Sequence, residues 1–202
     1  MFENCPSLVY VDMPNCLNIG DRSFIGCNSY NNVTFPLCLS IGDFSFSSLI
    51  GLTNVNLPSV NNIGESSFFK CQNLISASFE FCVTIGEECF AECSSLETIN
   101  FPRLRTIGFS AFTKTSLVEV KLNSLIEIET EFELWIGDVG RQFSGCSRLT
   151  SVTMNSLQTL KSYTFEDCGM LNEINIPSCT TIETNSLIGC RNIKKVSLGY
   201  LS

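Results

Sequence analysis

The chain has 202 residues, of which 44% are hydrophobic and 16% charged, so it can bury a core and is too apolar to be disordered. Its 20 acidic and 12 basic residues give a net charge of −8, which would repel a nucleic-acid backbone or an anionic membrane surface. The absence of histidine removes the usual general base and the neutral nitrogen ligand of metals, which excludes most hydrolase triads. We therefore expect an ordered protein with no nucleic-acid partner, no metal and no cofactor.

No apolar run is long enough to cross the roughly 30 Å hydrocarbon layer of a bilayer. Residues 1–14 also lack a basic segment followed by an apolar stretch. The sequence therefore predicts no membrane insertion and shows no signal peptide or anchor.

A phenylalanine recurs every 22 residues along most of the chain. It occupies positions Phe2, Phe24, Phe46, Phe68, Phe90, Phe112, Phe143 and Phe165, and Leu187 takes the same place next. An Ile-Gly pair keeps this period from Ile19-Gly20 to Ile107-Gly108 and loses its glycine in the last three units. Eight complete units and the strand of a ninth fill the chain, which indicates one solenoid over residues 1–202.

Each unit is expected to contain a strand, a turn and a short helical segment. In the fifth unit, residues 96–102 alternate apolar and polar side chains and stop at Pro102, which predicts a short strand. The glycine of the Ile-Gly pair favours a left-handed or tight turn. Residues 86–96, with Phe90 and Cys93 inward, have roughly helical spacing, which predicts a short helix or 3₁₀ segment on the convex side. The expected fold is an α/β solenoid, a right-handed leucine-rich-repeat superhelix with a parallel concave β-sheet.

The recurring pattern F-x-x-C-x-x-L-x-x-I-x-h-P, followed by I-G-x-x-x-F, resembles the BspA-like leucine-rich repeat, also called the Treponema-type repeat. The match covers nearly the whole chain in register. The resemblance implies a surface or secreted protein of the kind found in mucosal bacteria and parasitic protists, with a role in adhesion to host proteins and cells. The family has no shared active site, so the resemblance implies no catalytic residue.

One insertion interrupts the period. Ile128 and Phe143 are 15 residues apart, where other units have five, and the sixth unit is one residue short between Phe112 and Leu117. Residues 129–142 must therefore bulge from the convex side or the flank. This loop contains three candidate binding residues, Phe132, Trp135 and Asp138. The alternative is that its apolar residues fold back over the irregular sixth unit.

The twelve cysteines follow the repeat. Seven occupy one repeat position, three residues after the phenylalanine, and four more lie two residues after the proline position. Cysteine suits a tight interior slot as a small hydrophobe, which favours free thiols. Disulfides between units would require closely spaced turns, and the wider convex side is expected to keep successive turns too far apart. Cys89 and Cys93 have a metal-like spacing, but Cys93 already belongs to the interior column.

The strand register also predicts which side chains form the concave face. They are small, polar and mostly uncharged, which would suit a polar peptide surface or a glycan. An exposed strand face must in any case be polar to stay in water. The candidate binding residues of this face are Tyr10, Asp12, Asn32, Thr34, Asn54, Asn56, Ser76, Ser78, Thr98, Asn100, Glu119 and Lys121.

The leading functional hypothesis is an interaction module of surface or adhesin type that binds a protein or glycan. The alternative is a structural or intracellular scaffold with no ligand of its own. An enzyme would have to use paired carboxylates such as Glu131 and Glu133 on one loop, so we expect no catalysis. The first and last units lack polar caps, which predicts a fragment of a longer array or termini available for end-to-end self-association.

Overall fold

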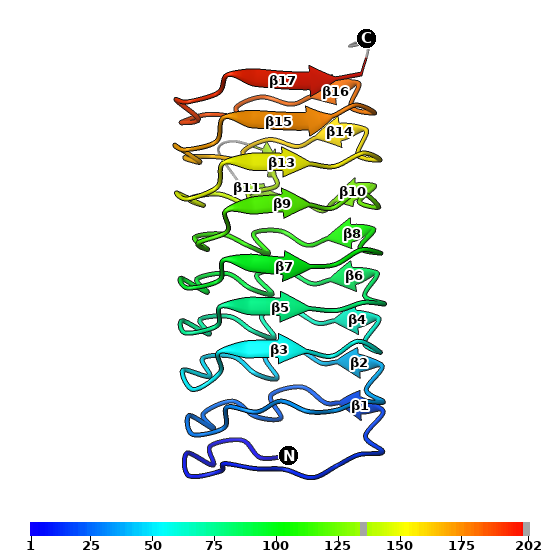
Figure 1. The fold of residues 1–202 in the computed structure, drawn as a ribbon, viewed down its shortest axis with the longest axis vertical. Helices are drawn as coiled ribbons and strands as arrows, with labels where there is room; N and C mark the ends of the chain where they lie inside the picture. The colour runs from blue at the N-terminus through cyan, green and yellow to red at the C-terminus, as the bar shows by residue number, and fades with distance from the viewer. Residues whose placement is uncertain (134–136, 200–202) are drawn as a thin grey trace.

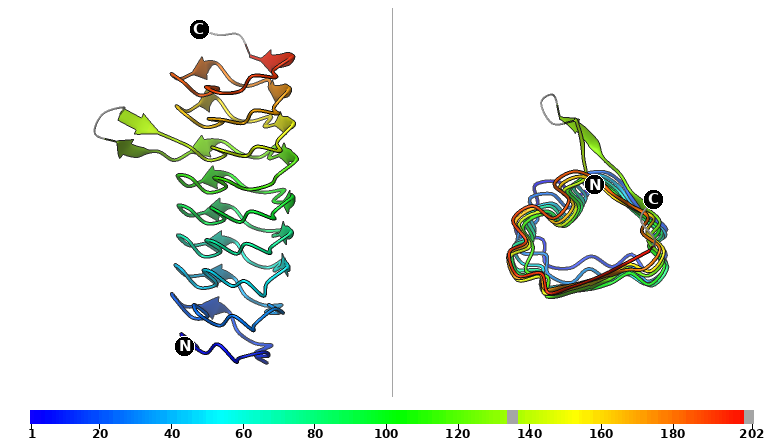
Figure 2. Two further views of the ribbon diagram at one scale, coloured as in Figure 1. Left: turned by 90° about the vertical axis from the view of Figure 1, so that its left-hand side faces the viewer. Right: turned by 90° about the horizontal axis from the view of Figure 1, so that it is seen from above.

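A computed structural model describes residues 1–133 and 137–199 as one stack of turns (Figure 1). Each repeat makes one turn, and equivalent residues of neighbouring turns, such as Asn54, Ser76 and Thr98, pair in parallel. Viewed along the axis, the turns superimpose closely beyond the first two (Figure 2). The predicted parallel solenoid is confirmed. The stack is close to straight, so the face expected to be concave is nearly flat.

The predicted strands form a first strand row on one side of the stack (Figure 1). Their central side chains point inward, and Val55, Ala77 and Val120 are buried between exposed or half-exposed neighbours. This alternation is the reason that a short apolar-polar run becomes a strand with one face on the core. The row consists of β3 (Asn54–Asn56), β5 (Ser76–Ser78), β7 (Thr98–Asn100), β9 (Glu119–Lys121), β13 (Ser151–Thr153), β15 (Glu173–Ile176) and β17 (Lys195–Leu198).

The first two turns lack the strands expected at residues 10–12 and 32–34. Tyr30 takes the place that leucine holds in other turns, such as Leu52. Its ring is fully buried and stacks on Phe24 with centroids 5.0 Å apart, and its hydroxyl has no hydrogen-bond partner within the described residues. Because a larger ring in a close-packed site forces the backbone to shift, we attribute the missing ladder to Tyr30.

A second strand row lies where the Ile-Gly pairs were expected to make turns (Figure 1). Each isoleucine of the complete Ile-Gly pairs is buried, and the residue before it is exposed or half-exposed. These dipeptides therefore also alternate between an outward and an inward side chain, as a strand does. The turn prediction was wrong at these positions. The row consists of β1 (Asn18–Ile19), β2 (Ser40–Ile41), β4 (Asn62–Ile63), β6 (Thr84–Ile85), β8 (Thr106–Ile107), β10 (Glu127–Ile128), β14 (Thr159–Leu160) and β16 (Thr181–Ile182).

Glycine follows these isoleucines because successive backbones approach closely, not because of a left-handed conformation. None of Gly42, Gly64 and Gly86 has a positive φ. A Cβ built on Gly64 would lie 2.9 Å from the carbonyl carbon of Gly42, and one on Gly86 would lie 2.7 Å from that of Gly64. The Ser45 hydroxyl links two such turns, with its Oγ 2.9 Å from the carbonyl oxygen of Gly20 and 2.6 Å from that of Gly42.

The third side of the stack was expected to contain short helices, and the described residues contain none. In the fifth unit, Glu88 and Glu92 have left-handed φ values of 48° and 57°. The backbone N–H groups of Glu88, Phe90 and Glu92 then donate to carbonyls of the following turn, at 2.7 to 2.9 Å. An α-helix would need right-handed φ throughout and would use these N–H groups internally. The helix prediction was wrong because the backbone hydrogen bonds run between turns.

The recurring phenylalanines form one continuous aromatic stack through the core. From Phe24 to Phe165 their rings are at most 1% exposed, and neighbouring centroids are 5.0 to 5.5 Å apart. The 5.5 Å step between Phe112 and Phe143 passes across the insertion without a break. The aromatic stack is therefore continuous on both sides of the insertion.

The irregular sixth unit interrupts both strand rows. No ladder pairs β7 with β9 in the first row or β10 with β14 in the second. The first interruption follows the missing residue before Leu117, and the second follows the insertion after Ile128. The missing residue shifts the register of the strand that follows it, whereas β13, the first strand of the stack after the insertion, still pairs with β9.

Candidate functional site

The strand face is the outward surface of the first strand row and of the corresponding segments of the first two turns. All twelve candidate residues from the sequence are exposed or half-exposed. Six of them lie in register on the ladder of β3, β5 and β7, and Glu119 and Lys121 lie on β9, which pairs with β13 instead. The other four, Tyr10, Asp12, Asn32 and Thr34, lie in turns without strands, so their side chains are not held in the same ladder.

Side chains on the strand face hydrogen-bond along the stack. Ser76 Oγ donates to Asn54 Oδ1 at 2.7 Å, and Asn100 Nδ2 donates to Ser78 Oγ at 3.0 Å. These bonds fix the orientation of the amides and hydroxyls before any ligand arrives, which lowers the entropy lost on binding. The face from β3 to β7 is therefore an ordered array of uncharged donors and acceptors.

Beyond β7 the strand face becomes charged. Lys121 pairs with Glu119 at 2.8 Å, and Lys195 pairs with Glu173 at 2.6 Å. An open cleft of about 320 Å³ lies where β7 and β9 do not pair. It is lined by Glu97, Thr98, Ile99, Val118, Glu119 and Lys121. Sequence reasoning missed this cleft, although the residue missing before Leu117 marked its position.

The insertion forms a hairpin that projects from the stack (Figure 2). Its strands are β11 (Glu131–Glu133) and β12 (Gly137–Val139), which pair antiparallel and place Phe132 opposite Asp138. Trp135 lies outside the described residues. The apolar side chains on which the fold-back alternative depends also lie outside the described residues.

Gln142 holds the base of this hairpin. Its side chain is fully buried, and Nε2 donates to the carbonyl oxygen of Glu129 at 2.7 Å and to that of Gly108 at 3.3 Å. It occupies the repeat position of Ser45, whose hydroxyl links the same kind of carbonyls. The Gln142 side chain is longer than that of serine, so its amide reaches the carbonyl of Glu129 at the start of the insertion.

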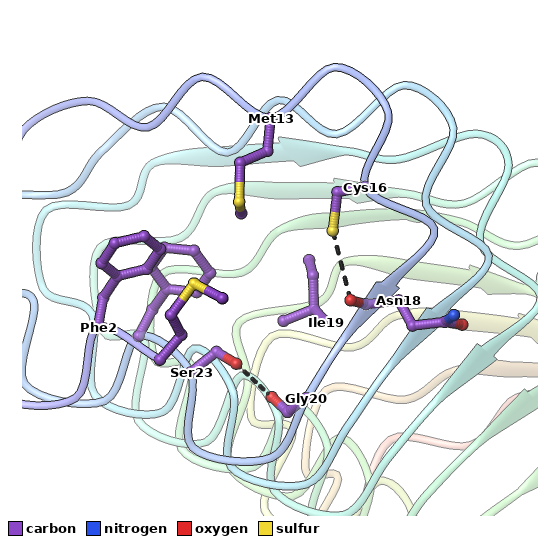
Figure 3. A pocket seen from close by; sticks show the side chains of 9 residues that line it. Phe2, Met13, Cys16, Asn18, Ile19, Gly20 and Ser23 are labelled. Carbon is purple, nitrogen blue, oxygen red and sulfur yellow. Dashed lines mark hydrogen bonds between the residues drawn. The ribbon is translucent and has the colours of Figure 1, made fainter.

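At the N-terminal end, a cavity of about 80 Å³ opens onto the core between Phe2, Met13 and Ile19 (Figure 3). Its polar groups are already engaged, since Cys16 Sγ donates to the carbonyl of Asn18 and Ser23 Oγ to that of Gly20. Ligand pockets are typically about 300 Å³ or more. The cavity is the uncovered end of the core and offers little room for a ligand.

Most of the cysteines are buried, and several of them donate hydrogen bonds within the core. All twelve are free thiols. Cys93 Sγ donates to the carbonyl oxygen of Phe68 at 3.0 Å, and Cys168 Sγ to that of Phe143 at 3.0 Å, one turn back in each case. The expectation that successive turns are widely separated on the side of the phenylalanines and cysteines was wrong, because the phenylalanine rings of neighbouring turns are about 5 Å apart. Within the described residues, no group of three acidic or sulfur ligands could hold a metal ion.

Buried thiols should make stability fall at alkaline pH. Burial raises the pKa of Cys82 to about 12 and also raises the pKa of Cys89 and Cys93. The pKa of a thiol in the unfolded chain is about 8.5. Below that pH the buried thiols contribute fully to the stability of the fold, and this contribution is lost as the pH rises toward their pKa values in the folded state. Between pH 9 and 11 we expect the Cys82 thiol alone to lower the free energy of unfolding by about 1.4 kcal/mol per pH unit.

Urea denaturation at several pH values would measure this slope. Cys82→Val, which introduces the residue that Val60 supplies at the equivalent position, should make the slope shallower, and Cys5→Ala at an exposed site should leave it unchanged. Equal slopes in wild type and Cys82→Val would contradict the prediction.

The pair Glu131 and Glu133 lies on β11 of the projecting hairpin, and the side chain of Glu133 lies outside the described part.

In residues 1–133 and 137–199 there is no helix with the length and hydropathy needed to span a bilayer.

Comparison with known proteins agrees with this architecture. The family model of the BspA type leucine-rich repeat region matches residues 18–132 and 139–200 with six copies. The unmatched residues 133–138 fall in the hairpin. No curated protein matches the chain at a significant level. No enzymatic family is indicated, since the matched family is a repeat family.

The similar solved structures include two leucine-rich-repeat proteins of bacteria. A leucine-rich-repeat protein of T. pallidum is 27% identical, with a TM-score of 0.69 over 89% of this chain and 78% of that one. A leucine-rich-repeat protein from Bacteroides ovatus ATCC 8483 is 24% identical, with a TM-score of 0.53 over 96% of this chain and 74% of that one, and supports the fold alone. The 22-residue period, the parallel register of the turns and the family match together show that the chain belongs to the BspA-type leucine-rich-repeat family.

Proposed function

We propose that the chain is an interaction module of surface or adhesin type, which presents its strand face to a host or partner macromolecule. Membership in a leucine-rich-repeat family indicates a protein-interaction module, and BspA-like proteins are often surface-associated.

The observation that carries the proposal is the ordered polar surface of β3, β5 and β7. Asn54, Asn56, Thr98 and Asn100 are exposed on a rigid parallel ladder, and part of their hydrogen-bonding capacity is free. Amides and hydroxyls at fixed spacing suit the backbone of an extended peptide or the hydroxyls of a glycan. Trp135, which follows β11 in the sequence, is a second proposed contact, because tryptophan is enriched among binding hot spots.

Binding to an array of extracellular-matrix proteins, host-cell surface proteins and glycans would test the proposal. The double variant Asn54→Asp/Asn56→Asp places two charges on the strand face. The matched control Asn61→Asp/Asn62→Asp adds the same charge to the same turn, beside the second strand row. We expect a saturable interaction that weakens about tenfold or more in the first variant and less than about twofold in the control.

Trp135→Ala reports separately on the hairpin. Loss of binding in Trp135→Ala alone would move the contact from the strand face to the hairpin. No binding to any member of the array would favour the scaffold alternative, in which the stack only spaces other parts of a longer protein.

A further inference from the structure

The corner between the two strand rows carries a second candidate surface, separate from the strand face. It lies along the right-hand edge of Figure 1, where the chain passes from β7 to β8 and from the first row to the second in the neighbouring turns. Here an open cleft of about 400 Å³ is lined by Val83, Arg103, Arg105, Ser124, Ile126 and Ser156, which we call the corner cleft.

Three of these residues stack directly on one another in consecutive turns. The backbone N–H of Arg105 donates to the carbonyl of Val83 at 2.8 Å, and that of Ile126 donates to the carbonyl of Arg105 at 3.0 Å. Leu104, between the two arginines, is fully buried, so Arg103 and Arg105 both face outward. The corner cleft is therefore a fixed feature of the ladder.

The charge of the corner cleft is unusual for this chain. All twelve basic residues lie in the described part, and seven of them form ion pairs with carboxylates. Within that part, Arg103 and Arg105 have no carboxylate partner, and the Arg103 guanidinium instead lies 4.3 Å from the centroid of the Phe81 ring. Two adjacent unpaired guanidinium groups in a chain of net charge −8 form a local positive site for carboxylates.

Apolar side chains surround these two charges. Ile126 is 52% exposed, Phe81 45% and Val83 36%, although each has a fully buried neighbour, Leu125 or Cys82. The hydroxyls of Ser124 and Ser156 donate to the carbonyls of Pro102 and Asn123, respectively, each at 2.8 Å. Their hydrogen atoms are therefore already used, and a ligand need not supply acceptors for them. A ligand that is only an anion would leave the apolar side chains exposed to water.

We propose that the corner cleft docks an acidic, apolar segment of a partner protein in extended conformation. Carboxylates on two alternate residues of that segment pair with Arg103 and Arg105, and apolar side chains at further alternate positions, on the same face of the segment, cover Val83 and Ile126. Alternate residues of a strand share one face and are roughly 6.6 Å apart. Two carboxylates on that face therefore match the spacing of Arg103 and Arg105, which are also alternate residues. This surface is independent of the strand face, so either assignment can fail without the other.

Fluorescence anisotropy with a labelled Val-Ser-Glu-Ser-Glu-Ser-Val peptide, which carries its glutamates and valines on one face when extended, would test the proposal on the full chain, with Val-Ser-Lys-Ser-Lys-Ser-Val as the charge control. We expect saturable binding of the acidic peptide only, weakened at least about tenfold by Arg103→Glu/Arg105→Glu. Arg103→Gln/Arg105→Gln should weaken it less, and Ile126→Ser should weaken it about fivefold. Raising salt from about 20 to 300 mM should also weaken it.

The matched control is Arg191→Glu/Lys194→Glu, which makes the same charge change at two other basic residues without a carboxylate partner in the described part. An equal loss in this control would show attraction by overall charge and would overturn the proposal. No saturable binding of the acidic peptide would also overturn it, as would an Ile126→Ser variant that binds like wild type. Sedimentation that shows a dimer abolished by Arg103→Glu/Arg105→Glu would identify a second copy as the occupant instead.

Discussion

Phe90→Ala should lower the free energy of unfolding by about 3 to 5 kcal/mol. Phe90 is fully buried, and its ring stacks between those of Phe68 and Phe112 at 5.0 and 5.3 Å. It also meets the edge of Phe101 at 5.9 Å. Alanine would leave a cavity in the middle of the stack, where the turns on both sides are fixed by hydrogen bonds and collapse poorly. Urea denaturation followed by circular dichroism would measure the change.

Two further variants decide whether the aromatic stack is the cause. Phe81→Ala removes a ring of the same size from a site that is 45% exposed, and we expect a loss below about 1 kcal/mol. The loss of unfolding free energy in Phe90→Leu should lie between those of the two alanine variants, because Leu187 shows that leucine fits this repeat position. A similar loss in Phe90→Ala and Phe81→Ala would contradict the prediction.

Gly86→Ala should also destabilise the stack strongly, by about 1 to 3 kcal/mol or more. The added Cβ would lie 2.6 Å from the backbone nitrogen of Glu65 and 2.7 Å from the carbonyl carbon of Gly64. Neither is the end of a flexible side chain, so two turns must move apart and their ladder must weaken. Hydrogen exchange of the amides in β4 and β6 would show the loss locally, and thermal unfolding would show it globally.

Gly169→Ala is the matched control for this substitution. A Cβ at Gly169 would meet no atom within 4 Å, and its φ is not positive. Alanine there should be neutral or stabilise by up to about 1 kcal/mol, because it restricts the unfolded chain. If Gly86→Ala proved as stable as Gly169→Ala, close approach of the turns would not explain the Ile-Gly pairs.

Much of the candidate surface could be predicted, because register follows from the period. Asn54, Ser76 and Thr98 are one repeat apart in the sequence, and they are direct neighbours on the strand face. The corner cleft could not be predicted in this way. Arg105 and Ile126 are 21 residues apart rather than 22, and their stacking depends on how the shortened sixth unit rejoins the ladder.

The sequence alone determined the period, the inward side chains, the first strand row from β3 onward and the looped-out insertion. These follow from local rules, since a regular apolar pattern has one way to bury its side chains. The tertiary structure decided what the backbone does between those side chains. Glu88 and Glu92 adopt left-handed φ, and Ile85 pairs as a strand, because their N–H and C=O groups find partners in the adjacent turns. Such bonds span about a whole repeat, so a pattern read within one unit cannot reveal them.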